Sequence, residues 1–474
     1  MEREIFLECG PDRVRMAVVE DGKLCEYAVE CAGQEKQTGS LYKGRVQRVL
    51  TGMQAAFVDI GLEKNAFLPL REGERLHGGD ERLVQVLKEP PGETKGLRVT
   101  QEIALPGRYC VFKPLGGGVS VSHKIEAAQR EQMRAALAPL CPPGAGLVLR
   151  TQAAQAGADD IRAEIDALTA RWRQIERDFG QKSGPGLVWR EENLALRMLR
   201  DVQNRETTRV CVQGSGALEA LRGQVPAEIL SGCESETPIF DLYGLEDKIE
   251  RATHRRIWLG CGGYLVIDPC EAMTVIDVNS GKYTGKAGLE ETAYAVNLEA
   301  AAEIARQLRL RDIGGIVVVD FIDMQETAHH EGLISAFQEA LLADRSKVNL
   351  VGLTGLGLAE LTRRRLSRPL GEVLQRPCPL CGGTGRVLSE EETARRALLQ
   401  ARRRLAGGSE AAYVISLHPA SAGALAALRA PRGAVIYALA RPGMGIEKFA
   451  LTPLLGGEDP PKGAALLKQE GMDS

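Results

Sequence analysis

Apolar and polar residues alternate in short runs near the start of the chain, and turn residues separate these runs. Three of them, Leu41–Val49, Ala55–Ile60 and Ala66–Leu70, follow one another with short turns containing Gly or Asn between them. Closely spaced short strands of this kind predict a small barrel, for which an OB-fold is the natural candidate. After a polar loop, the barrel can continue through residues 94–114.

The second run places two kinds of side chain on opposite faces of its strand. Ala56, Val58 and Ile60 share one face, which we assign to the barrel core. Phe57 lies on the other face, where its ring can stack on a nucleic-acid base or pack against a neighbouring domain. Phe67, in the third run, allows the same two interpretations.

A strand over Leu147–Leu149 is expected to end at an arginine and a threonine. Arg150 offers a planar fork of N–H donors and Thr151 a hydroxyl, and together they suit a phosphate group. The plainer alternative is that Arg150 pairs with a surface carboxylate. A helix is expected from about Asp159, because apolar residues then recur at helical spacing.

The middle of the chain predicts a hairpin, an amphipathic helix and a further strand. In that order the elements are Tyr264–Ile267 with Met273–Val278, Glu290–Arg311, and Ile316–Ile322. The last of these is continuously apolar, which is typical of a sheet covered on both faces. The helix makes the strands before and after it parallel neighbours, so their carboxyl ends lie at the same edge of the sheet.

Two aspartates and an asparagine stand at these two strand ends. Asp277 and Asp320 lie near the carboxyl ends of their strands, and Asn279 points the same way as Asp277 because side chains alternate along a strand. The apolar neighbours of Asp320 predict a buried carboxylate, which needs a partner. That partner is an arginine such as Arg306 or Arg311, or a hard cation, since two carboxylates and an amide suit Mg²⁺.

Of the 11 cysteines, only Cys378 and Cys381 stand at metal-ligand spacing. The glycines after them suit a zinc knuckle better than the helix of a redox C-x-x-C motif, so zinc is favoured. The six histidines are not spaced to complete the four ligands that zinc needs. The simplest completion is the same cysteine pair from a second chain, which predicts a homodimer or tetramer.

The charge balance limits the class of protein. The 60 Lys and Arg against 63 Asp and Glu leave a net charge of −3, which excludes a strongly basic nucleic-acid coat protein. No apolar run reaches the roughly 20 residues of a membrane span. The N-terminus lacks a signal-peptide pattern, so a cytoplasmic location is expected.

Four segments share their residues and their order with a known enzyme family. They read IDVNSGKYTG, VVVDFIDM, GLGLAELTRRRLSRPLGE and CPLCGGTGRV. In these segments, with the predicted barrel upstream, the chain resembles the ribonuclease E/G family of bacterial endoribonucleases over nearly its whole length. The length of the chain matches the family's catalytic region alone.

The resemblance implies a role for each candidate residue. The implied Mg²⁺ ligands are Asp277 and Asp320, the orienting group is Asn279, the base-stacking residues are Phe57 and Phe67, the 5′-monophosphate ligands are Arg150 and Thr151, and the ligands of a zinc ion shared between chains are Cys378 and Cys381.

The resemblance also implies a multidomain α/β and α+β fold. An RNase H-like subdomain is interrupted by the OB-fold and by a 5′-sensor region, and a DNase I-like catalytic subdomain follows. The expected boundaries are 1–38 and 206–255 for the RNase H-like parts, 39–122 for the OB-fold, 123–205 for the sensor, 256–375 for the DNase I-like subdomain, 376–387 for the zinc link and 388–474 for a small C-terminal dimerisation domain.

The implied function is a Mg²⁺-dependent endoribonuclease that cleaves single-stranded, A/U-rich RNA and leaves 5′-phosphate and 3′-hydroxyl ends. Stimulation by a 5′-monophosphate and roles in rRNA and tRNA processing and mRNA decay belong to the same expectation. The alternative is a non-catalytic OB-fold RNA-binding protein, which would not need Asp277 or Asp320. A zinc-containing chaperone is disfavoured, because such proteins carry several C-x-x-C-x-G-x-G copies and this chain has one.

Two positions depart from the family pattern. Gly355 stands in LTGLGL where the family commonly has a basic residue, so one RNA-backbone contact is expected to be missing or replaced. Gln152 opens a longer segment after Thr151, so the sensor loop is expected to differ in shape.

Overall fold

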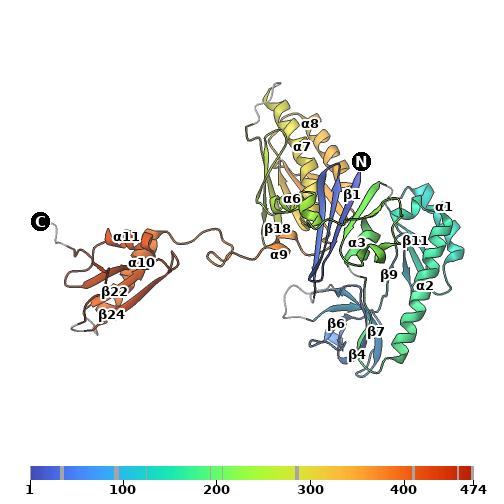
Figure 1. Cartoon of the computed structure of the whole chain (residues 1–474), viewed down its shortest axis with the longest axis horizontal. Helices are drawn as coiled ribbons and strands as arrows, with labels where there is room; N and C mark the ends of the chain where they lie inside the picture. The colour runs from blue at the N-terminus through green and yellow to red at the C-terminus, as the bar shows by residue number, and fades with distance from the viewer. Residues whose placement is uncertain are drawn as a thin grey trace. The chain divides into compact units, whose positions relative to one another are not determined.

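The chain folds into two compact units, Met1–Val373 and Leu374–Ser474 (Figure 1). The computed structural model describes residues 2–32, 37–89, 96–123, 125–192, 194–204, 206–282, 288–407, 412–455 and 458–470. None of the described helices is both long and apolar enough to cross a lipid bilayer.

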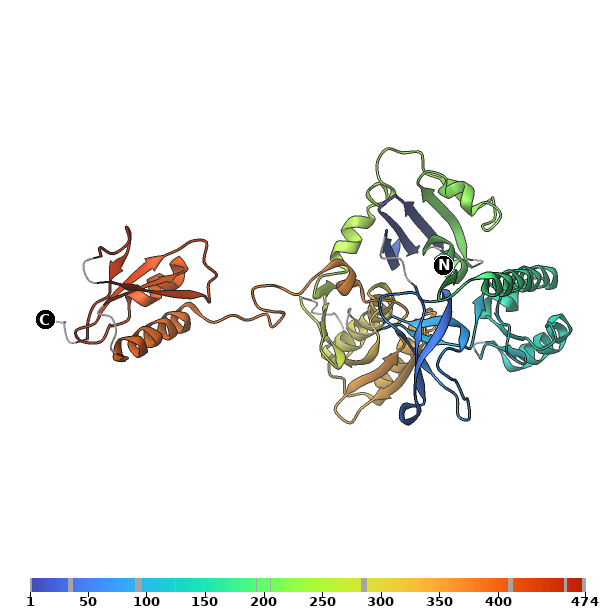
Figure 2. The same cartoon turned by 90° about the horizontal axis from the view of Figure 1, so that it is seen from below.

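The first sheet of the larger unit joins two distant segments of the chain. In the order β15-β14-β1-β2-β3, its strands are Leu230–Gly232, Thr207–Gln213, Arg3–Cys9, Arg13–Glu20 and Lys23–Cys31. β1 runs parallel to β14 and antiparallel to β2, so the N-terminal hairpin lies beside a strand from the middle of the chain (Figure 2).

Helices cover both faces of this first sheet. Ile5 and Leu7 of β1 face one core and Phe6 faces the other, and all three are fully buried. The first core takes residues from α3 (Leu194–Val202) and α4 (Ala217–Leu221), and the second from α5 (Ile239–Leu242) and α6 (Leu245–Arg251). A polar side chain in this sheet therefore has to find its partner inside the protein.

The predicted barrel is present. Its five strands close because β7 pairs back onto β4, and they are β4 Leu41–Leu50, β5 Ala55–Asp59, β6 Ala66–Pro69, β7 Glu81–Lys88 and β8 Arg98–Thr100. Ala56, Val58 and Ile60 are buried in its centre, as predicted. A further strand, β13 (Gly186–Trp189), pairs with the outer edge of β4.

The predicted continuation of the barrel beyond β8 is wrong. Pairing with β12 draws the following residues into a separate sheet of order β11-β12-β10-β9, with strands Gly118–Val121, Gly146–Leu149, Cys110–Lys113 and Leu105–Pro106. Helices α1 (Ala127–Leu137) and α2 (Ala158–Gln181) accompany this sheet. The predicted helix from about Asp159 is confirmed as α2, which buries Ile161, Ile165, Leu168 and Ile175.

A six-stranded sheet carries the predicted hairpin and βαβ unit. In the order β16-β17-β18-β19-β21-β20, its strands are Arg256–Trp258, Tyr264–Pro269, Met273–Asn279, Gly315–Asp320, Leu358–Arg363 and Val348–Leu353. β17 and β18 form the antiparallel hairpin, and β18 pairs in parallel with β19. Both relationships agree with the sequence-based prediction.

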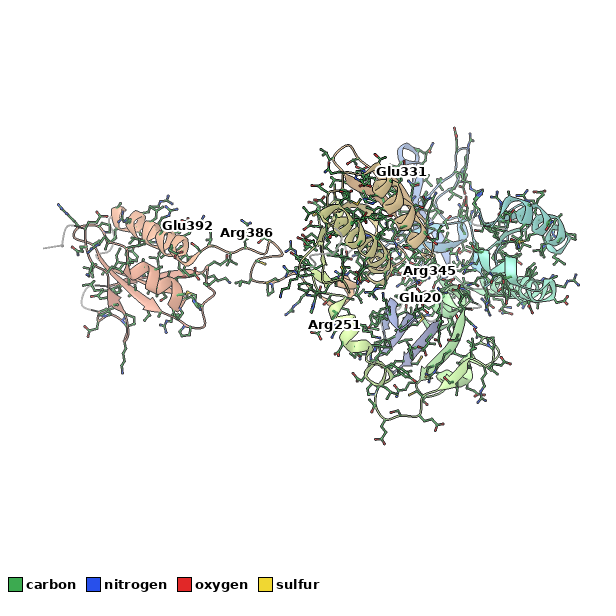
Figure 3. The ribbon with its side chains drawn as sticks, turned by 90° about the horizontal axis from the view of Figure 1, so that it is seen from above. Glu20, Arg251, Glu331, Arg345, Arg386 and Glu392 are labelled. Carbon is green, nitrogen blue, oxygen red and sulfur yellow. The ribbon has the colours of Figure 1, made fainter. Side chains whose placement is uncertain are left out.

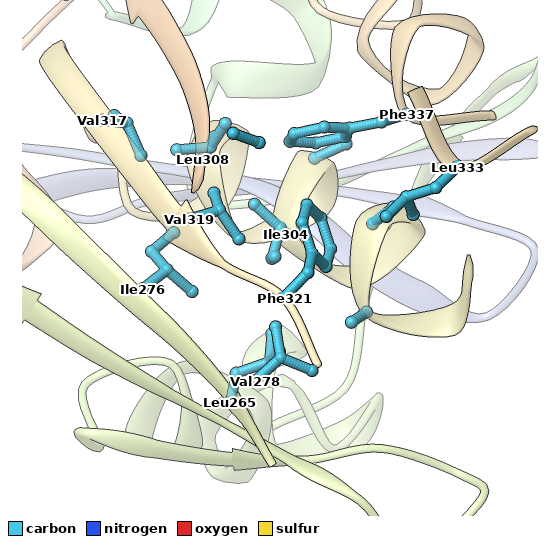
Figure 4. Packing of buried hydrophobic residues seen from close by; sticks show 14 of the residues in the cluster. Leu265, Ile276, Val278, Ile304, Leu308, Val317, Val319, Phe321, Leu333 and Phe337 are labelled. Carbon is cyan, nitrogen blue, oxygen red and sulfur yellow. The ribbon is translucent and has the colours of Figure 1, made fainter. Parts of the chain in front are cut away.

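Among the helices that the structure describes, α7 (Leu289–Leu310) and α8 (Thr327–Leu341) cover one face of this sheet, and the other face is left open. Figure 4 shows its core, where side chains of the sheet meet those of the two helices. On the other side, called the open face below, Met273, Ile316 and Val351 are exposed. The prediction of a sheet covered on both faces is therefore wrong. β19 is continuously apolar in the sequence because its open face also carries apolar residues.

The smaller unit is an α+β domain. Its sheet has the order β24-β22-β23-β25, with strands Phe449–Leu454, Ala412–Leu417, Val435–Ala440 and Ala465–Leu466. Helices α10 (Glu390–Ala406) and α11 (Pro419–Ala426) pack on this sheet, and α9 (Leu370–Leu374) spans the boundary between the units. The Ser389 hydroxyl caps α10 by accepting a hydrogen bond from the Glu392 amide at 3.2 Å.

Candidate active site

The two predicted aspartates lie side by side on the open face. Asp277 of β18 and Asp320 of β19 are direct partners in the register of the parallel pair, so their backbones are roughly 4.8 Å apart. Both side chains are exposed. In the described part of the chain, neither carboxylate forms an ion pair with a lysine, arginine or histidine.

The expectation that Asp320 is buried is wrong, and so is its pairing with an arginine. Asp320 points to the open face, whereas the three valines before it alternate between the two faces of the strand. Arg306 forms its ion pair with Glu303 at 2.5 Å, and Arg311 donates hydrogen bonds to Gln307 and to the His254 carbonyl. The predicted internal ion pair is therefore not formed by Arg306 or Arg311, which leaves the two carboxylates able to bind an external cation.

The electrostatics of the pair also favour a cation. The pKa of the Asp320 carboxyl is raised by its partial desolvation and by the negative charges of Asp277 and Asp323. Asn279 donates a hydrogen bond through Nδ2 to Asp277 Oδ2 at 2.8 Å, which sets the orientation of that carboxylate. Like charges held this close are stabilised by a positive ion between them.

The donor set suits an ion that keeps most of its water. Among the residues that the structure describes, no group of three or more His, Cys, Asp or Glu side chains forms a ready metal cage. Mg²⁺ is usually bound by one or two carboxylates together with waters and substrate phosphate oxygens. The last residues of the motif that follows Asn279, 283–285, lie outside the described residues.

Two residues that the sequence-based interpretation missed hold the chain just after Asp320. Asn297 of α7 is fully buried, and its carboxamide bonds the amide and the carbonyl of Ile322 at 3.0 and 2.8 Å. Glu290 accepts hydrogen bonds from the amides of Gln325 and Glu326. The signal for Asn297 was present in the sequence, as a polar residue on the otherwise apolar face of this helix.

The barrel presents a second candidate surface. Phe57 and Phe67 are direct partners on β5 and β6, with ring centroids 6.2 Å apart and an interplanar angle of 72°. Phe57 is 37% exposed and does not belong to the buried core of the barrel. Arg48 pairs with Phe57 and Arg98 with Phe67 in the strand registers, and both arginines are exposed. These flanking arginines were not predicted.

Arg150 and Thr151 lie where the sequence placed them, directly after β12. The plainer alternative for Arg150 is realised, because its Nη1 donates to Asp201 at 2.6 Å. Burial alone would raise the pKa of Asp201, but Arg150, Arg200 and Arg345 together lower it. A phosphate at this point would share Arg150 with Asp201. Gln152 donates to the Gln203 carbonyl at 3.0 Å and so ties the segment after Thr151 to the residue that follows α3.

Cys378 and Cys381 form a compact turn in the smaller unit. The Gly382 amide donates to the Cys378 carbonyl at 2.8 Å, and the Gly385 amide donates to the Cys381 sulfur at 3.3 Å. Hydrogen bonds from the amides of Gly385 and Gly383 lower the pKa of the Cys381 thiol. Amides directed at a sulfur stabilise the thiolate form, which is the form that binds zinc.

Comparisons with known proteins agree on one family. The model of the ribonuclease E/G family matches residues 104–366. Ribonuclease G of Escherichia coli K12 is 37% identical over 419 residues, which cover 82% of this chain and 86% of that protein. Ribonuclease G of Haemophilus influenzae is 37% identical over 416 residues, 82% of this chain and 84% of its own length. Ribonuclease E of Escherichia coli K12 is 35% identical over 423 residues, 82% of this chain but 39% of its own length.

Proposed function

This chain belongs to the ribonuclease E/G family and is an endoribonuclease. We propose that it cleaves single-stranded, A/U-rich RNA and that Asp277 and Asp320 form its active site. The observation that carries the proposal is the adjacency of these two exposed carboxylates, which have no cationic partner among the described residues. The roles in rRNA and tRNA processing and in mRNA decay are part of the same proposal.

Asp277 and Asp320 would hold Mg²⁺, and Asn279 would keep the Asp277 carboxylate in place. When bound, Mg²⁺ supplies the activation of water for in-line attack and the neutralisation of charge on phosphorus. The hydrogen bonds between Asn297 and the Ile322 backbone would help to hold the end of β19, and with it Asp320, in place. Attack by water on this path leaves 5′-phosphate and 3′-hydroxyl ends.

The barrel would bind the unpaired bases. Phe57 and Phe67 offer ring faces for stacking, and Arg48 and Arg98 offer positive charge for the backbone on either side. Arg150 and Thr151 would bind a 5′-monophosphate, with Asp201 holding the guanidinium ready. A local arrangement of this kind is consistent with a net charge of only −3.

We also assign the first sheet to a split RNase H-like subdomain (1–38 and 206–255) and the six-stranded sheet to a DNase I-like subdomain (256–375). The pairing of β1 with β14 supports the first assignment, because it unites segments separated by the barrel and the sensor region. The remaining proposed boundaries are 39–122 for the OB-fold, 123–205 for the sensor, 376–387 for the zinc link and 388–474 for the dimerisation domain.

The test of the proposed function uses matched RNAs. Single-stranded oligonucleotides with a 5′-monophosphate or a 5′-hydroxyl are incubated with and without Mg²⁺, and the product ends are mapped. We expect cleavage only with Mg²⁺, 5′-phosphate products, and cleavage of the monophosphorylated RNA faster by about tenfold or more, since charge-assisted hydrogen bonds contribute about 1.5–3 kcal/mol. Binding without cleavage would instead support a non-catalytic RNA-binding protein.

The zinc link is tested by stoichiometry. Cys378 and Cys381 of two chains would share one zinc ion, which predicts one zinc per two protomers and a weaker assembly in Cys378→Ser. Atomic absorption together with sedimentation measures both quantities, and Cys270→Ser, at another exposed cysteine, is the control. A monomer that binds one full equivalent of zinc would contradict the shared site.

A further inference from the structure

An exposed aromatic cluster lies on the open face, outside every site considered so far. Trp258 of β16 is 59% exposed, and its ring centroid lies 5.2 Å from that of Tyr264 on β17 at an interplanar angle of 62°. The Arg256 guanidinium lies 4.5 Å from the Tyr264 ring and 5.9 Å from the Trp258 ring. No carboxylate in the described ranges forms an ion pair with Arg256, whereas its neighbour Arg255 pairs with Asp268.

The register of the sheet places this cluster beside the carboxylate pair. Tyr264 is the direct partner of Asn279, and Trp258 is the partner of Tyr264. Val266, two residues after Tyr264 on the same strand, pairs with Arg256 on one side and with Asp277 on the other. The cluster therefore stands one to two strand spacings from the strand of Asp277 and two to three from the strand of Asp320, which is roughly 5–14 Å.

The hairpin that carries the cluster is held firmly. Glu299 of α7 accepts hydrogen bonds from the amides of Gly260 and Cys261 in its turn, at 2.5 and 3.1 Å. On the other side, Gly281 approaches so closely that a Cβ there would lie 2.4 Å from the Gly262 carbonyl oxygen. The aromatic hairpin and the segment after Asn279 are thus packed backbone to backbone, so their relative position is fixed.

We propose that Trp258, Tyr264 and Arg256 form a stacking subsite for a nucleotide next to the scissile phosphate. The inference rests on the proposed function and adds a binding role for these residues. The exposed Trp258 indole meets the Tyr264 ring edge to face and offers a platform on which a base can stack. Arg256 supplies positive charge for a phosphate. Charge complementarity and direct continuity with the carboxylate pair favour RNA over a second copy of the chain as the occupant.

The first test measures KM and kcat on a 5′-monophosphorylated, single-stranded RNA with one cleavage site. Trp258→Ala is expected to raise KM about tenfold, because stacking on one aromatic ring contributes on that order. Trp258→Phe keeps a ring and is expected to stay near the wild type. Leu342→Ala is the matched control, since Leu342 is 75% exposed and lies at the end of α8, on the opposite side of the sheet.

The second test identifies the contacted nucleotide and the phosphate. Each nucleotide near the cleavage site is replaced in turn by an abasic residue, and Kd is measured without Mg²⁺ by fluorescence anisotropy. At the contacted position, the abasic residue weakens binding by wild-type protein but has no further effect in Trp258→Ala. Arg256→Ala is expected to lower the slope of log Kd against log salt by about 0.7, the value of one single-strand phosphate contact.

The outcomes separate this inference from the proposed function. If RNA is cleaved with Mg²⁺ but Trp258→Ala has wild-type KM, or if abasic penalties are equal in both proteins at every position, the subsite is absent. If Trp258→Ala instead dissociates the oligomer in light scattering, the cluster is an interface between copies and the inference is overturned. If wild-type protein does not cleave RNA at all, the proposed function fails, while the Kd measurements still test the subsite.

Discussion

Two acidic clusters in the larger unit have opposite surroundings. Glu20 ends β2 after two valines, and Asp320 ends β19 after three, so the two acids look alike in the sequence. Glu20 is 7% exposed and bonds Arg3 and Arg309, each at 2.7 Å. Asp320 is exposed beside Asp277 and has no cation against it in the described part of the chain.

The two clusters differ in the source of the positive charge that neutralises their carboxylates. Glu20 and Glu26 share Arg309, and Glu26 also bonds Arg345 at 3.1 Å; Figure 3 labels Glu20 and Arg345. These acids belong to a sheet covered on both faces, so only internal arginines can neutralise them. Asp277 and Asp320 lie on an open face, where a metal ion and RNA can reach them. The first cluster is structural, and the second is proposed to be catalytic.

Removal of the metal gives the largest expected effect on the open cluster. Without Mg²⁺, cleavage should fall by about 1,000-fold or more, because a bound metal contributes several kcal/mol to transition-state stabilisation. The free energy of unfolding should stay nearly constant, since no core contact changes. Single-turnover cleavage and urea unfolding in the same metal-free buffer measure both. Undiminished cleavage in the metal-free buffer would show that the open cluster does not act through a metal ion.

Glu20→Gln should have its effect on stability instead. The change leaves Arg309 buried without its full partner, so the free energy of unfolding should fall by about 3–5 kcal/mol. Glu206→Gln is the control, because Glu206 lies 4.0 Å from the same Arg3 but is exposed, and a surface pair contributes about 1 kcal/mol or less. Equal losses in the two variants, measured by urea unfolding, would show that burial does not distinguish the clusters.

Acid should lower the free energy of unfolding through the buried cluster, as the Glu20→Gln substitution does. Burial alone would raise the pKa of Glu20, but hydrogen bonds and charges from Arg309 and Arg3 lower it from 4.5 to about 2. Because the folded value lies below the unfolded one, this stabilisation of about 3 kcal/mol is present above pH 4.5 and is lost as the pH falls toward 2. The stability difference between wild type and Glu20→Gln should therefore shrink between pH 5 and roughly pH 3. A constant difference would contradict this pKa.

Phe57→Ala should give the smallest effect, and on RNA binding alone. Losing one stacking ring costs about 1–3 kcal/mol of affinity, whereas an exposed ring contributes little to folding. Phe57→Tyr keeps the ring and is the matched control. Anisotropy titration with single-stranded RNA measures the change. A loss of stability with unchanged affinity would make Phe57 a packing residue like the buried Phe6.

The alternation of Ala56, Val58 and Ile60, and the order strand, helix, strand, were sufficient to predict the barrel and the adjacency of Asp277 with Asp320. Local periodicity carries such information because it reports which face of a strand is buried. The partner of an acid is a tertiary contact, and Arg309 is too distant in sequence from Glu20 for any local pattern to connect them. For the same reason, the open face and the Trp258 cluster were not predicted, since an apolar run does not report which of its faces another layer covers.

The role proposed for the open carboxylate pair is tested most directly by comparing Asp277→Asn with wild-type protein, prepared in the same way. Cleavage of a 5′-monophosphorylated single-stranded RNA in saturating Mg²⁺ and the free energy of unfolding in urea are measured together. We predict a loss of cleavage of about 1,000-fold or more in Asp277→Asn, with a free energy of unfolding within about 1 kcal/mol of wild type. Cleavage at the wild-type rate by the folded variant would contradict it.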